Sequence, residues 1–248
     1  MADHLADHLV DHLVVLGVCK SFGALRVVDG ISFNLAEGET LGILGPNGAG
    51  KTTLFNLISG DLRADAGTIV LGGRDITRQA PHRRCRLGIG RSYQIPQPWG
   101  AMTVFENLVA AASFGAGKSE AATYPRAVEL LRETGLLPQA NRPAAALRLL
   151  DRKRLELARA LATEPRLLLL DEIAAGLTEG EAALLIEELR RIKAQGVTMI
   201  WIEHVVHALL AVADRLLVMS QGRPLAEGAP HLVINDPEVK RVYLGIEA

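Results

Sequence analysis

Aromatic residues are scarce in this 248-residue chain: phenylalanine, tryptophan and tyrosine make up 4 % of it, whereas hydrophobic residues of all kinds make up 49 %. A core with so few rings must be mainly aliphatic. This composition favours a parallel sheet covered by helices over an aromatic-rich sandwich of two sheets. The length suffices for one α/β domain with a sizeable core.

Cysteine, net charge and long apolar segments are lacking as well. Cys19 and Cys85 are isolated, which argues against a disulfide framework or a cysteine metal site and suggests a reducing compartment. The formal net charge of −1 gives no global sign of binding to nucleic acid or to an anionic membrane. No apolar run approaches the ~18 residues that span a bilayer, and no secretory signal is recognisable. We expect a cytosolic protein that reaches a membrane only by docking on another protein.

The N-terminal segment repeats Asp-His-Leu three times at four-residue spacing within residues 3–13. On a helix, His4, His8 and His12 would share one face and could bind a metal ion. The alternative, which we favour, is a solvated leader, because short terminal segments are usually poorly ordered. We therefore expect residues 1–12 to be disordered and a single domain to occupy residues 13–248.

Strands and helices alternate along the rest of the chain, which is typical of a parallel sheet wound on both faces. Residues 95–147 differ, since their helical stretches 104–112 and 127–133 are joined by links rich in Gly and Ala. We predict a sheet core at 13–94 and 164–235, a helical insertion at about 95–163 and a tail at 236–248. The predicted strands are 14–20, 27–35, 40–44, 67–71, 167–170, 197–202 and 216–219. Besides the two helical stretches named above, the predicted helices are 51–59, 152–162, 179–194 and 205–212.

A glycine-rich segment follows the predicted strand 40–44 and precedes a predicted helix, and it matches the phosphate-loop pattern G-x-x-x-x-G-K-[ST]. Its glycines allow backbone N–H groups to turn toward phosphate oxygens, and the helix N-terminus adds its positive dipole end. Lys51 is expected to reach the β and γ phosphates, and the Thr52 hydroxyl to hold Mg²⁺. The predicted nucleotide-binding residues here are Gly45, Pro46, Asn47, Gly48, Ala49, Gly50, Lys51, Thr52 and Thr53.

Two carboxylates end the apolar strand 167–170. Asp171 suits the coordination shell of Mg²⁺, usually through water, and Glu172 can polarise a water molecule for attack on the γ phosphate. Such general-base assistance is worth about 10²–10⁴-fold in rate. The alternative is an acidic pair that only stabilises a helix N-terminus.

Together these motifs resemble the ATP-binding subunits of ABC transporters, and the resemblance covers nearly the whole chain from about residue 13. It implies that Phe22 in KSFG stacks on adenine, and that Gln94 in RSYQ links the Mg²⁺ and water site to the helical insertion. It also implies that His204 in WIEH contacts the γ phosphate. Taken singly, Phe22 could be a core residue, Gln94 a loop residue and His204 a histidine at a strand end.

The segment 88–108 and the tail DPEVKRVYLG (236–245) are similar to those of ATPases from branched-chain amino-acid importers. This resemblance implies ATP and Mg²⁺ as ligands, a second ATPase subunit in a homodimer or heterodimer, two permease subunits and, indirectly, a solute-binding protein. The implied location is the inner face of the cell membrane. Relatives of this type also suit urea, amides or organic acids. The permease contact would lie near residues 94–103, where Trp99 and Met102 are candidates unless they only pack in the core.

The sequence departs from the family where such subunits carry the signature LSGGQ or LSYGQ. The residues Leu147, Arg148, Leu149, Leu150 and Asp151 occupy these positions, so that 148–151 depart from the motif, and Asp151 is a plausible N-cap for the following helix. Ile173 replaces a usual proline, and Thr178-Glu179 replace a frequent Asn-Pro. The resemblance implies that all three changes lie in parts that face a partner subunit or position the dimer contact, whereas the residues that bind the chain's own nucleotide are intact.

Several functions remain open after this comparison. In a heterodimer, the site completed by residues 148–151 would be slow or would mainly bind ATP, and the other site would hydrolyse it. Alternatively, these residues are a working variant signature. A nucleotide-binding regulatory subunit without turnover is disfavoured by the intact Glu172 and His204. A non-transport ATPase acting on nucleic acid or the ribosome would need tandem ATPase domains or a basic arm, which this chain lacks.

Overall fold

The computed structural model describes residues 12–244, and these divide into two compact units. One unit contains residues up to Pro81 together with those from Thr198 onward, and the other contains His82–Val197. Residues 1–11 of the predicted disordered leader, with His4 and His8, lie outside the described residues, whereas His12 is buried and its backbone N–H donates to the carbonyl oxygen of Leu35 at 2.8 Å, so the prediction is wrong at this residue. None of the described helices has the length and apolar composition needed to cross a membrane.

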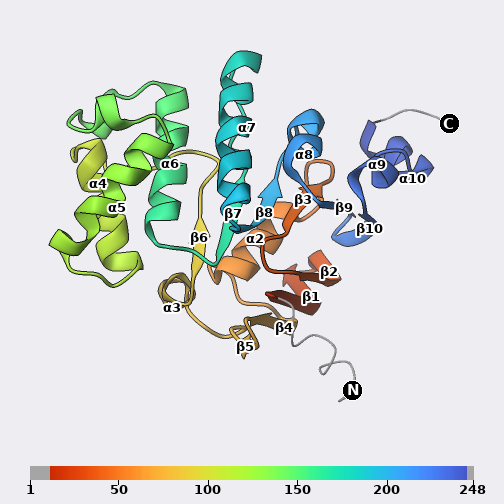
Figure 1. The fold of residues 1–248 in the computed structure, drawn as a ribbon. Coiled ribbons are helices and arrows are strands. Elements are labelled where there is room, and N and C mark those ends of the chain that lie inside the picture. Colours follow the sequence, from red (N-terminus) through yellow and green to blue (C-terminus); the bar gives the residue numbers. More distant parts are fainter. Residues whose placement is uncertain (1–11, 245–248) are drawn as a thin grey trace. The chain divides into compact units, whose positions relative to one another are not determined.

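The first unit contains an antiparallel sheet with the strand order β2-β1-β4-β5 (Figure 1). Its strands are β1 (Leu13–Phe22), β2 (Leu25–Leu35), β4 (Ala66–Leu71) and β5 (Arg74–Asp75). Leu13 pairs with Leu35 of β2 and with Leu71 of β4, so the first strand of the chain lies between the other two long strands. The predicted antiparallel N-terminal region is thereby confirmed.

The same unit contains parallel strands, because β3 (Thr40–Leu44) pairs in parallel with both β8 (Thr198–Ile202) and β9 (Arg215–Ser220). All residues of β3 and β8 are buried, as expected for strands covered on both faces. The strand β10 (Arg223–Gly228), which we did not predict, forms an antiparallel hairpin with β9 through Gln221 and Gly222, both of which have positive φ. The helices of the first unit are α2 (Lys51–Ser59), α8 (Val206–Val212), α9 (Pro230–Val233), α10 (Pro237–Val239) and the π-helical turn at Lys240–Leu244.

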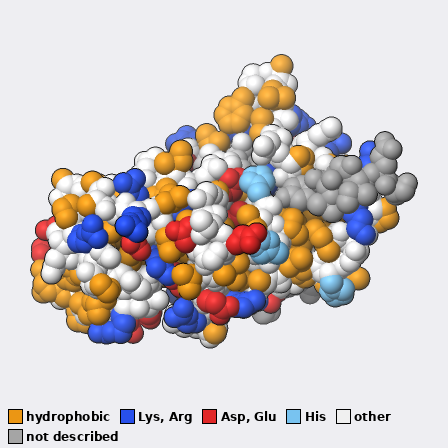
Figure 2. All heavy atoms as spheres, turned by 90° about the horizontal axis from the view of Figure 1, so that it is seen from above, with side chains coloured by type: hydrophobic (Ala, Val, Ile, Leu, Met, Phe, Trp, Pro, Cys, Tyr) orange, Lys and Arg blue, Asp and Glu red, His pale blue; other side chains and the backbone are white. Residues whose placement is uncertain are grey.

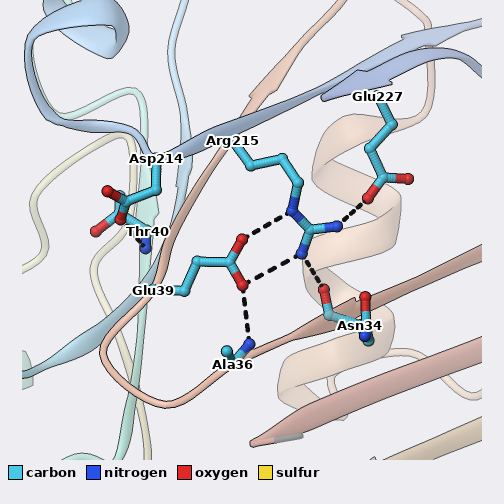
Figure 3. A network of polar contacts seen from close by, with 7 residues as sticks. All are labelled: Asn34, Ala36, Glu39, Thr40, Asp214, Arg215 and Glu227. Carbon is cyan, nitrogen blue, oxygen red and sulfur yellow. Dashed lines mark hydrogen bonds and ion pairs between the residues drawn. The ribbon is translucent and has the colours of Figure 1, made fainter. Parts of the chain in front are cut away.

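Arg215 connects several parts of this unit (Figure 3). Its guanidinium donates to both Glu39 oxygens, at 2.7 and 3.3 Å, to the carbonyl oxygen of Asn34 and to Glu227. Glu39 also accepts a hydrogen bond from the backbone N–H of Ala36. The cation therefore joins the end of β2, the turn before β3 and both strands of the β9–β10 hairpin.

The second unit is mostly helical, as predicted for the insertion, and also contributes two parallel strands, β6 (Ile89–Arg91) and β7 (Leu167–Asp171). Among its helices, α4 contacts both α5 and α6 (Figure 1). A capping box formed by Thr103 and Glu106 fixes the start of α4. Its elements further include α3 (Pro81–Arg86), α4 (Val104–Gly115), α5 (Glu120–Glu133), α6 (Leu149–Ala162), α7 (Glu179–Ala194) and short 3₁₀ turns at Leu137–Gln139 and Ala144–Ala146.

The buried side chains are mainly aliphatic, as the composition predicts. Leu41, Ile43 and Leu44 are fully buried in the first unit, and Leu168 and Leu170 in the second. Burial of each such side chain contributes about 1.5–3 kcal/mol relative to its exposure to water. On the face drawn in Figure 2, apolar side chains also lie among charged ones at the surface.

Candidate functional site

The phosphate loop connects β3 to α2 within the first unit. Gly45, Gly48 and Gly50 have φ values of 152°, 80° and 95°, which side chains rarely adopt. A Cβ atom on Gly45 would lie 2.3 Å from the carbonyl oxygen of Met219, and one on Gly50 would lie 2.4 Å from that of Val27. The loop therefore needs glycine at these two positions both for its conformation and for space.

Lys51, the first residue of α2, is buried, and its ammonium group folds back over the loop. Nζ donates to the carbonyl oxygens of Gly45 at 2.6 Å and Pro46 at 3.0 Å. Thr52 is exposed, Thr53 is half-buried, and the first turn of α2 contains no acidic residue that would offset the helix dipole. A glycine-lined turn with a cation and a helix N-terminus fits a chain of phosphate groups.

His204 lies two residues beyond the end of β8 and is exposed. The residue before it, Glu203, is buried, and its Oε1 accepts hydrogen bonds from the backbone N–H groups of His204 at 2.9 Å and Val205 at 3.4 Å. Glu203 thus fixes the turn that carries the histidine. We did not predict this role, although an acidic residue at the end of a buried strand is a recognisable sign of such a turn.

Phe22 ends β1 and is 48 % exposed, so it does not occupy the core position considered as its alternative. The Lys20 ammonium lies 5.7 Å from the centre of its ring and also forms an ion pair with Asp65 at 2.7 Å. One face of the ring is therefore close to a cation, and the side chain remains accessible to a ligand.

The two predicted carboxylates lie in the second unit at the end of β7. Asp171 is buried, and its Oδ2 lies 3.5 Å from Nη2 of Arg91. Glu172 has a φ of 45°, a strained value for a residue with a side chain and one that is frequent at functional sites. Gln94 donates from Nε2 to Oε2 of Glu172 at 2.5 Å. The structure thus brings together the glutamine and the glutamate that the motifs single out.

Lys153 of α6 is close to the same pair, although we did not predict it. It is 3 % exposed, and its Nζ donates to the carbonyl oxygens of Gln94 at 2.8 Å and Glu172 at 3.2 Å. Glu156, one turn further along α6, is also buried, and burial raises the pKa of its carboxyl group against the opposing effect of Arg159. From the sequence these charges are indistinguishable from a solvated helix face.

The variant signature forms the start of α6, and here one prediction is wrong. The helix begins at Leu149 with Arg148 at the N-cap, so Asp151 lies in the first turn and is not the N-cap residue. The reason is that Arg148 already has the extended backbone of an N-cap, and leucines continue readily into a helix. Asp151 instead forms an ion pair with Arg154 at 3.7 Å, and its negative charge interacts favourably with the positive end of the helix dipole.

The other departures from the family have local explanations. Ile173 is 1 % exposed and packs in the core. Thr178 and Glu181 form a complete capping box at the start of α7, so threonine serves as the N-cap of this helix. The hydrogen bonds from the Thr178 backbone and side chain lower the pKa of the Glu181 carboxyl group.

Comparison with known protein families matches residues 28–175 to the family described as ABC transporter. The chain is 38 % identical to the high-affinity branched-chain amino acid transport ATP-binding protein LivG of Salmonella typhimurium, covering 93 % of this chain and 96 % of that protein. It is 37 % identical to LivG of Escherichia coli K12, covering the same 93 % and 96 % of the two chains. It is also 36 % identical to BraF of Pseudomonas aeruginosa, again covering 93 % and 96 % of the two chains.

Comparison with solved structures gives the same picture. The ADP conformation of MJ1267, an ATP-binding cassette of an ABC transporter, is similar with a TM-score of 0.86 and 33 % identity, covering 95 % of this chain and 99 % of that one. A nucleotide-free ATP-binding cassette gives the same TM-score and identity, with coverage of 95 % and 100 %. The predicted fold class, with parallel strands, an antiparallel N-terminal sheet and an additional helical part, is confirmed.

Proposed function

The chain belongs to the ABC transporter family as an ATP-binding subunit that hydrolyses ATP, and we propose that it drives import of branched-chain amino acids or related small solutes. Such subunits work with membrane permease subunits. The observation that carries the choice of solute is the similarity to LivG and BraF over 93 % of the chain, because their names specify branched-chain amino acid transport. Urea, amides and organic acids are the alternative solutes.

The residues of the phosphate loop, 45–53, are assigned to the phosphates of ATP, and Phe22 to its adenine ring. Lys51 supports this assignment because its ammonium group lies over the loop carbonyl oxygens. We assign Thr52, Gln94 and Asp171 to Mg²⁺, since hydroxyl, amide and carboxylate oxygens are the ligands that this ion prefers. When bound, Mg²⁺ neutralises charge on the phosphate groups.

Glu172 is assigned as the residue that orients and deprotonates the attacking water, and His204 as a donor to the γ phosphate. The hydrogen bond from Gln94 supports the role of Glu172, because it fixes the orientation of the carboxylate that would accept the proton. Glu203 supports the role of His204 by fixing the backbone of its turn.

We assign asymmetric roles to the two ATP sites of a dimer with a second ATPase subunit. The first N–H groups of a helix have no partner within it, so the start of α6 still offers donors to a phosphate. However, Leu149 is 44 % exposed there, and Arg148 provides no side-chain cap. These side chains disfavour close approach, so we expect the site completed by residues 148–151 to turn over slowly and the other site to carry hydrolysis.

The permease contact is assigned to residues 94–103. Trp99 and Met102 support this assignment because they are 43 % and 41 % exposed, so neither is an ordinary core residue. The Arg159 guanidinium lies 4.3 Å from the centre of the Trp99 ring and fixes its orientation. In such a complex, two permease subunits would bind the ATPase dimer, and a solute-binding protein would deliver the solute.

ATP turnover by the purified chain, alone and with its partner ATPase subunit, tests this function, with Glu172→Gln as control. We expect little turnover alone, turnover in the mixture, and its loss in Glu172→Gln. Turnover by the chain alone that Glu172→Gln abolishes would show that residues 148–151 form a working signature. No turnover in either sample would refute the proposed hydrolysis. Uptake of leucine against urea by the reconstituted transporter then tests the solute.

A further inference from the structure

Three charged residues of α6 lie one turn apart in a single row: Lys153, Glu156 and Arg159. Residues spaced by three along a helix are neighbours on its surface, and such charges usually point into water. Here Lys153 and Glu156 are 3 % and 4 % exposed, and the Arg159 side chain is 16 % exposed. Two members of the row are therefore buried and the third is half-buried, at a cost in desolvation that hydrophobic residues of the same size would avoid.

All three side chains bind the backbone of the loop around Gln94. Lys153 donates to the carbonyl oxygen of Gln94, and Arg159 donates to that of Gln97 at 2.9 Å. Glu156 accepts hydrogen bonds from the backbone N–H groups of Tyr93 and Gln97. Because these bonds go to backbone atoms, they fix the position of the loop whatever side chains it carries.

Lys153 differs from the other two because it also reaches the second half of the candidate catalytic pair. Its ammonium group donates to the backbone carbonyl oxygens of both Gln94 and Glu172, and the side chains of these two residues form a hydrogen bond with each other. Gln94 and Glu172 are therefore connected twice, once through Lys153 and once directly. Glu172 has left-handed backbone geometry at this point, which needs support from its surroundings. A single buried cation thus fixes the backbones of Gln94 and Glu172 relative to each other.

We propose that Lys153 is a positioning residue for ATP hydrolysis, which holds Gln94 and Glu172 in the arrangement needed to orient the attacking water. This inference rests on the proposed function, since it takes the roles of these two residues from there. Removal of the ammonium group lets the two backbones move apart while the phosphate loop is unchanged. The chemical step therefore suffers, and ATP binding does not.

The test compares Lys153→Met, which has similar volume and no charge, with Lys153→Arg, which keeps a cation. Lys118→Met is the matched control, because the Lys118 side chain is 42 % exposed and lies in the same unit. Steady-state ATPase rates are measured with the partner ATPase subunit present. We expect kcat to fall about ten-fold or more in Lys153→Met, because small displacements of catalytic groups cost up to about 10²-fold. KM for ATP stays within about two-fold, and Lys153→Arg recovers most of the rate.

Further measurements separate positioning from a purely structural role. If Lys153 acts through Gln94, the effects of Lys153→Met and Gln94→Ala on kcat are not additive. Additive effects, an unchanged kcat in Lys153→Met, or a fall in kcat matched by a rise in KM would overturn the proposal. If Lys153→Met does not fold, Lys153→Gln takes its place with the same expectations. A wild-type sample without turnover would refute the proposed function and this inference with it, and that outcome is read before any variant is measured.

Discussion

Substitution of Arg215 by methionine tests the network that supports the strand leading to the phosphate loop. The change removes a cation that contacts two carboxylates, Glu39 and Glu227, and leaves their negative charges close to each other. Glu39 directly precedes β3, and β3 ends at the phosphate loop. We therefore expect the first unit to lose stability when the cation is lost.

The magnitude follows from burial. Removal of one partner from a fully buried ion pair costs about 3–5 kcal/mol. The side chains of Arg215, Glu39 and Glu227 are 23 %, 17 % and 30 % exposed, so water can reach the carboxylates once the cation is gone. We expect a loss of about 2–3 kcal/mol in the free energy of unfolding, between the buried limit and the value of about 0–1 kcal/mol for exposed pairs.

Urea unfolding followed by far-ultraviolet circular dichroism measures this loss, with Arg26→Met as the control. Arg26 forms an ion pair with Asp29 at 2.8 Å, and its side chain is 60 % exposed, so its removal costs at most about 1 kcal/mol. Equal stability of the two variants would contradict this expectation. Addition of Glu227→Gln to Arg215→Met should restore part of the loss. If it restores none, lost packing and not uncompensated charge explains the effect.

Three further substitutions probe the site and the second unit. Gly50→Ala places a Cβ 2.4 Å from the Val27 carbonyl oxygen. The affinity for a fluorescent ATP analogue should therefore fall about ten-fold or more, and an unchanged affinity would contradict the geometry. Phe22→Ala should raise the Kd for ATP about two- to ten-fold, because aromatic stacking is worth about 0.5–1.5 kcal/mol. The free energy of unfolding in urea should stay nearly unchanged, and an unaltered Kd would argue against adenine stacking. Burial raises the pKa of Glu188 above 4.5 despite Arg154, so its stabilising contribution is full below about pH 4.5 and is lost as pH rises through the folded pKa. The difference in unfolding free energy, wild type minus Glu188→Gln, should therefore fall as the pH rises above about 4.5, and a constant difference would show that this pKa is not raised.

Elements with clear boundary signals could be predicted closely from the sequence. The strand Thr40–Leu44 and the helix Lys51–Ser59 have the predicted bounds, because glycines mark the loop between them. The helix Glu179–Ala194 also matches, since Thr178 marks its start and Gly196 lies just beyond its end. In contrast, α5 begins at Glu120 and contains Pro125, whereas the prediction began it at residue 127. Ser119 stands at the N-cap of α5, but Pro125 usually indicates a helix boundary, and in this helix it lies in the interior.

The candidate site was predictable where chemistry is carried by a motif, and not where it depends on contacts between distant residues. Lys51, Asp171 and Glu172 are recognisable because neighbouring residues define their surroundings. Lys153 donates a hydrogen bond to the backbone carbonyl oxygen of Gln94, which lies 59 positions away in the sequence. A contact of this kind leaves no pattern in the residue types of either segment.

The position of Lys153 also bears on the variant signature. The same helix carries residues 148–151 at its start and the row of Lys153, Glu156 and Arg159 along one face. Because α6 continues without interruption from Leu149, a change in the side chains of its first turn leaves the row at the same rotation about the helix axis. The signature could therefore diverge without displacing Gln94 or Glu172. This separation explains physically how a chain could keep its own hydrolytic residues while it offers its partner an altered signature.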